Sequence, residues 1–432
     1  MRGWRVLAVL LVLLLTASTA FAAGFRLPEA GNKANAMAFA FTAQADNPSA
    51  IYYNPAGLTQ LEGNNIALGV TYVKENGGTF NGFTPVDNFA AFKSETQKDL
   101  NFFIPNMYYT HTTKGGWIAY GVGVFAPFGL GQEYENENTS IFRNQITKID
   151  LQTVVVNPTF AFKINEAISV GFGVDFMYGR AELERTPWNP ALAAANNGNV
   201  YNLDLEGDGT AWGYNFGILV KATPNLRFGA NYRSPFTLEI KAGDVNLSNI
   251  HPAARAAFGG STYSTEGGAQ IKMPATFAFG AAYTVGRLTV EADADWTLWS
   301  SYQSLPIWFS QPVPPFLPAG SDTPKRWEDV WALRTGLEYR VTDPIALRAG
   351  FSYDPTPAPA ETLGPELPDA DRLYYTLGAG FKFGSWTIDI SGIYIDKKDR
   401  TVNNMSLTTL TGQNGTWTAD AWLAGLDIAY KF

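Results

Sequence analysis

The chain of 432 residues contains no cysteine and only two histidines, His111 and His251. Without cysteine, no disulfide can stabilise an exported fold. Neither histidine lies near a serine in a recognisable nucleophile motif, and no spacing of residues is typical of a metal site. We therefore predict that the protein is not an enzyme and needs no metal or cofactor, and we expect its stability to come from a closed sheet.

Charge and long apolar runs are also scarce. Only 16% of the residues are charged, and the basic clusters that would indicate a nucleic-acid partner are missing. An apolar run over residues 6–15 follows Arg2 and Arg5 and precedes the small residues Ala20 and Ala22, as in a secretory signal peptide. A membrane-spanning helix needs about 20 apolar residues. We predict a signal peptide over residues 1–22 and no helical membrane domain.

The abundance of acidic residues, glycine and aromatic residues indicates a membrane barrel. Of the 31 lysines and arginines, Arg2 and Arg5 lie in the leader, so 29 basic side chains remain against 39 acidic ones, a balance of about −10. The chain also has 42 glycines, and 14% of its residues are aromatic. This balance is unusual for a soluble domain, but aromatic girdles, lipid-facing apolar residues and glycines on a crowded inner wall would explain it.

Residues 23–62 differ from everything after them. They are rich in alanine, which favours helix, yet Pro48, Pro55 and Gly57 interrupt any long helix. The tetrapeptide Asn54-Pro55-Ala56-Gly57 is a turn signal, because proline presets φ and glycine tolerates positive φ. We predict a compact unit of short helices and turns, although the tetrapeptide alone would equally suit a surface turn.

From Ile66 onward the sequence alternates with a period of two, and we count about fourteen segments of roughly 9 to 17 residues, as expected for transmembrane strands. In the segment 286–299, Leu288 and Val290 face one way, while Glu291, Asp293 and Asp295 face the other. Carboxylates cannot face lipid cheaply, so they must line the lumen. We interpret the inner charges as structural ion pairs, with a polar conduction path as the alternative.

Several motifs resemble one known family, the FadL family of outer-membrane transporters for long-chain fatty acids and other hydrophobic compounds. They are Gly24-Phe25, the run from Asp46 to Ala50, Asn54-Pro55-Ala56, Trp212-Gly213, Tyr232-Arg233-Ser234, residues 296–300, Asp369-Ala370-Asp371-Arg372 and the terminal Phe432. The resemblance implies an all-β fold, an antiparallel transmembrane β-barrel (63–432) whose lumen is plugged by an N-terminal hatch (23–62). It also implies a monomer in the bacterial outer membrane that moves its substrate by passive diffusion.

The end of the third predicted strand is a candidate gate, formed by Phe125, Pro127, Phe128 and Gly129. Proline removes a ladder donor and glycine weakens pairing, so this strand should bend locally. The resemblance implies an inward kink that opens the wall beside the hatch for lateral release into outer-membrane lipid; the alternative is an ordinary strand end. We further expect Asn54, with Pro55 and Ala56, to latch the hatch to the kinked strand.

Two predicted external loops, 186–210 and 242–270, carry apolar side chains that call for a partner. The resemblance implies a hydrophobic groove that first captures substrate, with Trp188, Leu192, Ile250 and Phe258 as the candidates. The alternative, which does not exclude the first, is that these side chains pack together as a lid.

Arg185, at the outer end of the fifth predicted strand, shares the inward phase of Asp175 and Met177. Guanidinium matches a carboxylate bidentately, so Arg185 could bind a substrate head group. The resemblance supports this role and implies a companion lysine, for which Lys325 is the nearest candidate and Arg326 the alternative.

The terminal Phe432 resembles the signal by which outer-membrane barrels are recognised by their insertion machinery. The main alternative function is a general porin for small polar solutes, which a polar lumen would suit but a plug would not. A third possibility is an external binding or adhesion protein that works through its loops.

Overall fold

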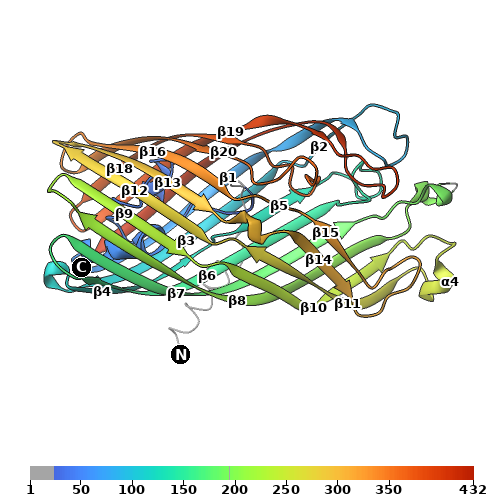
Figure 1. Cartoon of the computed structure of the whole chain (residues 1–432), viewed down its shortest axis with the longest axis horizontal. Coiled ribbons are helices and arrows are strands. Elements are labelled where there is room, and N and C mark those ends of the chain that lie inside the picture. Colours follow the sequence, from blue (N-terminus) through green and yellow to red (C-terminus); the bar gives the residue numbers. More distant parts are fainter. Residues whose placement is uncertain (1–23, 194) are drawn as a thin grey trace.

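The computed structural model describes residues 24–193 and 195–432, so the predicted signal peptide over 1–22 lies outside the described residues. The described chain forms one closed antiparallel β-barrel with a small N-terminal unit inside it (Figure 1). The barrel has 14 strands, as predicted, although several of them are divided into two β segments.

The first ten segments are β1 (Gly63–Phe83), β2 (Lys93–Thr96), β3 (Leu100–Thr112), β4 (Ile118–Phe125), β5 (Gly129–Glu133), β6 (Lys148–Lys163), β7 (Ile168–Arg185), β8 (Asn202–Lys221), β9 (Leu226–Arg233) and β10 (Phe236–Ser248). The others are β11 (Tyr263–Met273), β12 (Thr276–Val285), β13 (Leu288–Thr297), β14 (Ser304–Phe309), β15 (Gly320–Pro324), β16 (Val330–Arg340), β17 (Ile345–Asp354), β18 (Arg372–Phe383), β19 (Trp386–Asn403) and β20 (Asn414–Lys431).

The helices are short. They are α2 (Asn32–Asn35), α3 (Ala50–Tyr53), η1 (Pro55–Gln60), η2 (Lys114–Gly116), η3 (Pro190–Leu192), η4 (Asn196–Gly198), α4 (Arg255–Phe258) and η5 (Trp299–Ser301). Within the described ranges, no helix is long and apolar enough to cross a membrane.

The barrel closes where its first and last strands meet. β1 pairs with β20 from Asn65↔Lys431 onward, and Asn64 and Phe432 exchange two backbone hydrogen bonds of 3.1 and 2.9 Å. Tight turns connect the strands at this end, and Gly286 and Gly384 take a φ of +60° in two of them, which glycine tolerates best. The long loops and α4 lie at the opposite end (Figure 1).

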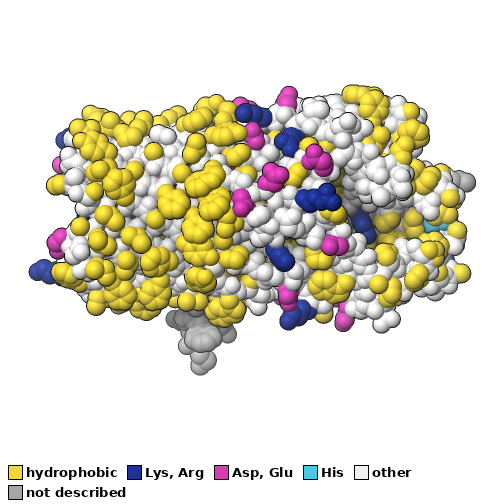
Figure 2. Space-filling view, in the orientation of Figure 1, with side chains coloured by type: hydrophobic (Ala, Val, Ile, Leu, Met, Phe, Trp, Pro, Cys, Tyr) yellow, Lys and Arg dark blue, Asp and Glu magenta, His cyan; other side chains and the backbone are white. Residues whose placement is uncertain are grey.

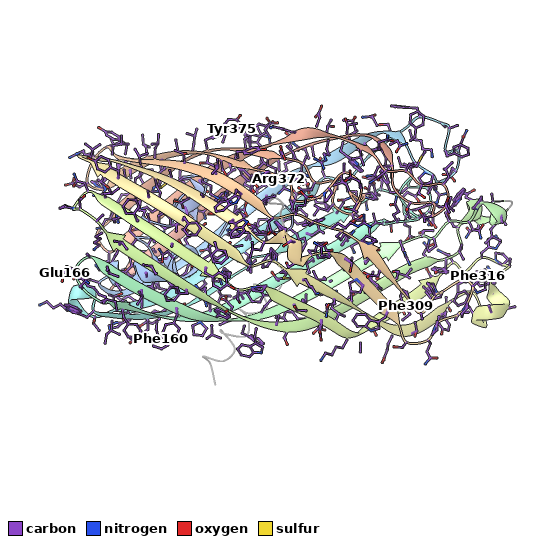
Figure 3. The ribbon with its side chains drawn as sticks, in the orientation of Figure 1. Phe160, Glu166, Phe309, Phe316, Arg372 and Tyr375 are labelled. Carbon is purple, nitrogen blue, oxygen red and sulfur yellow. The ribbon has the colours of Figure 1, made fainter. Side chains whose placement is uncertain are left out.

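The two faces of the wall follow the predicted alternation. Glu291, Asp293 and Asp295 are buried on the inside, whereas side chains such as Phe160 and Tyr375 point away from the wall (Figure 3). The outer surface is apolar over the half that bears the short turns, and charged side chains gather beyond it, towards the long loops (Figure 2). This apolar band is the surface that a membrane barrel presents to lipid.

The strands extend further outward than the sequence indicated. Parts of the predicted loops belong to the wall, because β8 begins at Asn202 and β10 continues to Ser248. In this region the outer face of the wall is polar and its inner face packs against loops. The apolar, lipid-facing side chains that make a transmembrane strand recognisable are therefore missing there.

Candidate functional site

The N-terminal unit, residues 24–61, fills the lumen (Figure 1). Its Asn54 side chain is fully buried and donates to the backbone oxygens of Thr42 at 2.8 Å and Ile218 at 3.0 Å, while its oxygen accepts from Ala56 N at 3.2 Å. Asn54 therefore caps η1 and ties the hatch to β8. It does not bond to the kinked third strand as we expected, because the turn of Asn54 and Pro55 lies against β8.

Acidic side chains of the inner wall hold the middle of the hatch. Asp293 accepts hydrogen bonds from the backbone N–H groups of Phe41 and Thr42, both at 2.9 Å. Glu291 accepts from the next two N–H groups, at 2.6 Å from Ala43 and 3.0 Å from Gln44. These carboxylates satisfy four hatch donors that would otherwise be buried without partners.

Glu29 of the hatch differs from these acids. It is buried, and neither carboxylate oxygen has a hydrogen-bond partner among the described residues. Burial raises the pKa of Glu29 to about 8, against the weaker effects of its own backbone N–H and of Arg334 and Arg372 nearby. Its carboxyl group is therefore largely neutral at pH 7.

The wall is interrupted between β3 and the third barrel strand, which β4 and β5 form together. Pairing of β3 with β4 ends at Met107↔Val124 and resumes only outside the gap, where Lys98 N donates to Glu133 O at 2.9 Å. Residues 100–106 of β3 therefore have no ladder partner on this side among the described residues. Phe103, on the outer face of this stretch, is 52% exposed.

The start of the hatch closes the inner side of this interruption. Leu27 N donates to Pro127 O at 2.8 Å, and Gly129 N donates to Phe25 O at 2.9 Å. The Phe25 ring is 4.8 Å from Trp299, 5.3 Å from Tyr302, 5.6 Å from Trp327 and 6.1 Å from Phe128, measured between ring centroids. An aromatic cage thus holds the segment that occupies the inner side of the gap.

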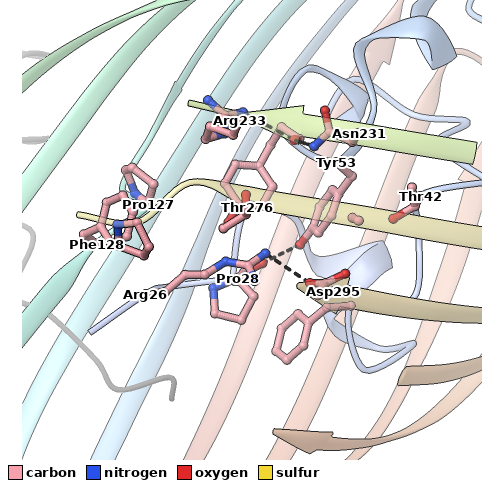
Figure 4. A pocket seen from close by; sticks show the side chains of 14 residues that line it. Arg26, Pro28, Thr42, Tyr53, Pro127, Phe128, Asn231, Arg233, Thr276 and Asp295 are labelled. Carbon is pink, nitrogen blue, oxygen red and sulfur yellow. Dashed lines mark hydrogen bonds and ion pairs between the residues drawn. The ribbon is translucent and has the colours of Figure 1, made fainter. Parts of the chain in front are cut away.

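A cavity of about 20 Å³, enough for one water molecule, lies behind Pro127 and Phe128 (Figure 4). Across it, Arg26 of the hatch forms an ion pair of 3.1 Å with Asp295 of β13. Arg233 lies on another side, with its guanidinium 5.1 Å from the Phe125 ring. The gate residues named from the sequence therefore meet hatch and wall at one place.

A larger cavity of about 400 Å³ opens at the outer mouth. Both predicted head-group residues, Arg185 at the end of β7 and Lys325 just after β15, line it. Lys325 is buried and paired with Glu366, whereas Arg326 is exposed. The apolar part of the lining consists of Ile146, Ile149, Leu183, Leu305, Ile307 and Leu363.

The predicted capture groove is closed in this structure. Ile250 and Phe258 are buried in a cluster with Tyr201, Leu247 and Phe309, and Leu192 packs half-buried against it. Trp188 lies apart from them and lines a different cavity of about 710 Å³ with Asp87, Asn138 and Arg143. Ile250, Phe258 and Leu192 thus pack together, whereas Trp188 does not join them.

Several residues at the site were not singled out by the sequence. Trp299 ends the predicted strand 286–299, but Tyr302 and Trp327 come from the stretch 300–330, which we took for an external loop. Only the fold brings all three to Phe25. Pro105 within β3 did carry a signal, since proline inside a strand favours an unpaired edge.

Comparison with known proteins gives a consistent result. The family model described as "Outer membrane protein transport protein (OMPP1/FadL/TodX)" matches residues 13–432. The chain is 24% identical to the long-chain fatty acid transport protein of Shigella flexneri over 464 residues, which cover 98% of each protein.

Solved structures that share the fold include the following two. One is a Pseudomonas aeruginosa FadL homologue, with a TM-score of 0.80 and 22% identity over 95% of this chain and 100% of that one. The other is the Ralstonia pickettii toluene transporter TbuX, with a TM-score of 0.68 and 20% identity over 93% and 98%.

Proposed function

The chain belongs to the family of outer membrane transport proteins described as OMPP1/FadL/TodX, and on this premise we propose how it carries hydrophobic compounds across the bacterial outer membrane. The substrates are long-chain fatty acids or related apolar molecules, as the names of its relatives suggest. Transport is passive diffusion through a monomer, in three steps: capture at the outer loops, binding in the lumen and lateral release through the wall.

The interrupted pairing of β3 with β4 and β5 carries this proposal. Unpaired backbone groups are not tolerated at membrane depth unless something else satisfies them, and here the N–H of Gly129 and the oxygen of Pro127 bond to the hatch instead of β3. Withdrawal of residues 25–27 would leave an opening between the lumen and the lipid.

Lateral release also suits the substrate. Each methylene kept out of water is worth about 0.8 kcal/mol, so an apolar chain gains nothing by entering the periplasm first. Release into lipid avoids that step, and it needs no energy source.

The outer cavity supplies the binding step. We infer that the apolar side chains in its lining contact the hydrocarbon chain and that Arg185 binds the carboxylate head group. We propose Arg185 and Lys325 as the head-group residues, and Trp188, Leu192, Ile250 and Phe258 as the lid that must open for capture. Phe432 remains our candidate for recognition by the insertion machinery.

The test is a bulky residue at the gate. Gly129→Trp should fill the gap and block uptake of a labelled fatty acid into cells, while the barrel keeps its resistance to heat unfolding. The matched control is Gly392→Trp, because a side chain at Gly392 of β19 would meet open space. Normal uptake in Gly129→Trp would contradict lateral release, and liposome swelling by sugars would favour the porin.

A further inference from the structure

The two cationic side chains that line the outer cavity, Lys325 and Arg185, differ in their ion pairing. Lys325 forms an ion pair with Glu366, and their side chains are 5% and 20% exposed. Arg185 has no ion-pair partner among the described residues, and its Nε is buried without a hydrogen bond. One cation is therefore already occupied by a carboxylate of the protein, while the other is free for a ligand.

Glu366 reaches Lys325 because Gly364, two positions before it, has no side chain in the way. Its side chain folds back over Gly364, where an added Cβ would overlap the Glu366 carboxylate oxygen Oε2. Lys325 is held from its other side, since its N–H donates to Gln303 O at 2.8 Å and its oxygen accepts from the Thr362 hydroxyl. The backbone of the lysine is thus held in place, and of the two paired side chains the glutamate is the more exposed.

A substrate carboxylate would offer Lys325 the same group that Glu366 offers. The exchange of one carboxylate for another leaves the buried ammonium paired, so it avoids the large penalty of an uncompensated buried charge. The displaced Glu366 lies on the partly exposed side of the pair and can turn to solvent.

We propose that Glu366 is an internal competitor for anionic substrates: it occupies Lys325 in the empty transporter and must be displaced when an acid binds there. This inference rests on the proposed function, because it assumes that the outer cavity binds substrate. Neutral hydrocarbons do not compete for Lys325, so Glu366 sets how strongly the cavity prefers an acid to a neutral molecule.

The experiment compares hexadecanoate and hexadecane binding to the full-length protein in nanodiscs. Glu366→Gln should bind hexadecanoate roughly 10-fold more tightly, the size of one charge-assisted hydrogen bond that need no longer be broken. Hexadecane binding should not change. The matched control is Glu361→Gln, which removes the same charge from the same cavity but no partner of Lys325.

A second variant keeps the charge and removes the contact. Gly364→Ala should push the flexible Glu366 carboxylate away from Lys325 and so tighten hexadecanoate binding as Glu366→Gln does. If Glu366→Gln loses the heat resistance of the folded barrel, Gly364→Ala still tests whether Glu366 competes with the substrate for Lys325.

Three results would overturn the inference. One is unchanged hexadecanoate affinity in both variants while wild-type binding is intact; another is equal tightening in Glu361→Gln, which would indicate a general charge effect. The third is a parallel gain for hexadecane, which would indicate a wider cavity. Wild-type protein that binds neither ligand would instead refute the proposed function, and the inference with it.

Discussion

The wall from β16 to β19 and the wall from β3 to β6 consist of the same kind of strand, yet they differ in pairing. β17 and β18 pair without interruption from Ile345↔Phe381 to Asp354↔Arg372, and β18 and β19 do so from Phe383↔Trp386 to Arg372↔Lys397. Across the barrel, β3 pairs with β4 only from Met107 to Thr112, and among the described residues its stretch 100–106 has no ladder partner on that side.

The difference shows which residues form hydrogen bonds with the backbone groups of each wall. The regular wall satisfies its own N–H and C=O groups, so it can open only by unfolding. In the interrupted wall, hatch residues 25–27 form backbone hydrogen bonds with the third strand instead. Opening there needs only a local movement of the hatch, and local movements have far lower free energies than global unfolding.

The largest expected effect is that of Phe25→Ala. Removing a buried ring from the aromatic cage should cost about 3–5 kcal/mol of local stability. The amides of Leu27 and Gly129, which bond across the gap, should then exchange much faster, while amides of β17 stay protected. Hydrogen exchange of the folded barrel measures both.

Phe41→Ala provides the control for this variant. Phe41 is equally buried, but its N–H is held by Asp293, away from the gap. It should loosen the middle of the hatch and leave Leu27 and Gly129 unchanged. Equal exchange at Gly129 in both variants would mean that the two walls do not differ in this way.

A smaller effect is expected of Arg185→Ala. This variant tests whether substrate bound in the outer cavity goes on to the interrupted wall. Losing a hydrogen bond to a charged group should weaken fatty acid binding by about 1.5–3 kcal/mol, and uptake should fall in proportion. A neutral hydrocarbon should bind as before. Titration with both ligands decides this, and equal losses for the two would make Arg185 a structural residue.

Arg180→Ala is the matched control, because Arg180 lies on the same strand but is exposed and paired with Glu206. Its removal should change neither ligand's affinity. A loss as large as that of Arg185→Ala would point to β7 as a whole and not to the cavity.

The smallest effect should come from Asn54→Ala, which releases the hatch from β8. Loss of this cap should cost about 1–2 kcal/mol, so amides of residues 50–60 should exchange faster and transport should change, with heat resistance retained. Gly129 should be unaffected. If amide exchange and uptake both stay at the wild-type level, Asn54 is not a latch. If the barrel unfolds, Asn54 has a structural role.

Much of the architecture could be predicted, because it depends on local pattern. The alternation of Glu291, Asp293 and Asp295 with apolar neighbours assigned β13 and its inner face, and Pro127 with Gly129 marked the interruption. Both signals are carried by consecutive residues, so no knowledge of distant contacts was needed.

The candidate site was predicted less completely. Arg185 and Lys325 line one cavity, and their role in head-group binding stays a prediction. Glu366 was not foreseen. The expected latch, Asn54, bonds to β8, while residues 25–27 make the contact with the third strand. Such pairings join residues 41 to 164 positions apart, and a one-residue change in strand register would alter them.

The sequence by itself determined that this protein is a β-barrel with a polar lumen, because alternation and turn residues act over a few neighbouring positions. Only the tertiary structure decided which hatch residues close the gap, which aromatic rings cage Phe25 and which carboxylate occupies Lys325. The physical reason is that closing the barrel sets the distances between strands, and those distances select partners that no local pattern encodes.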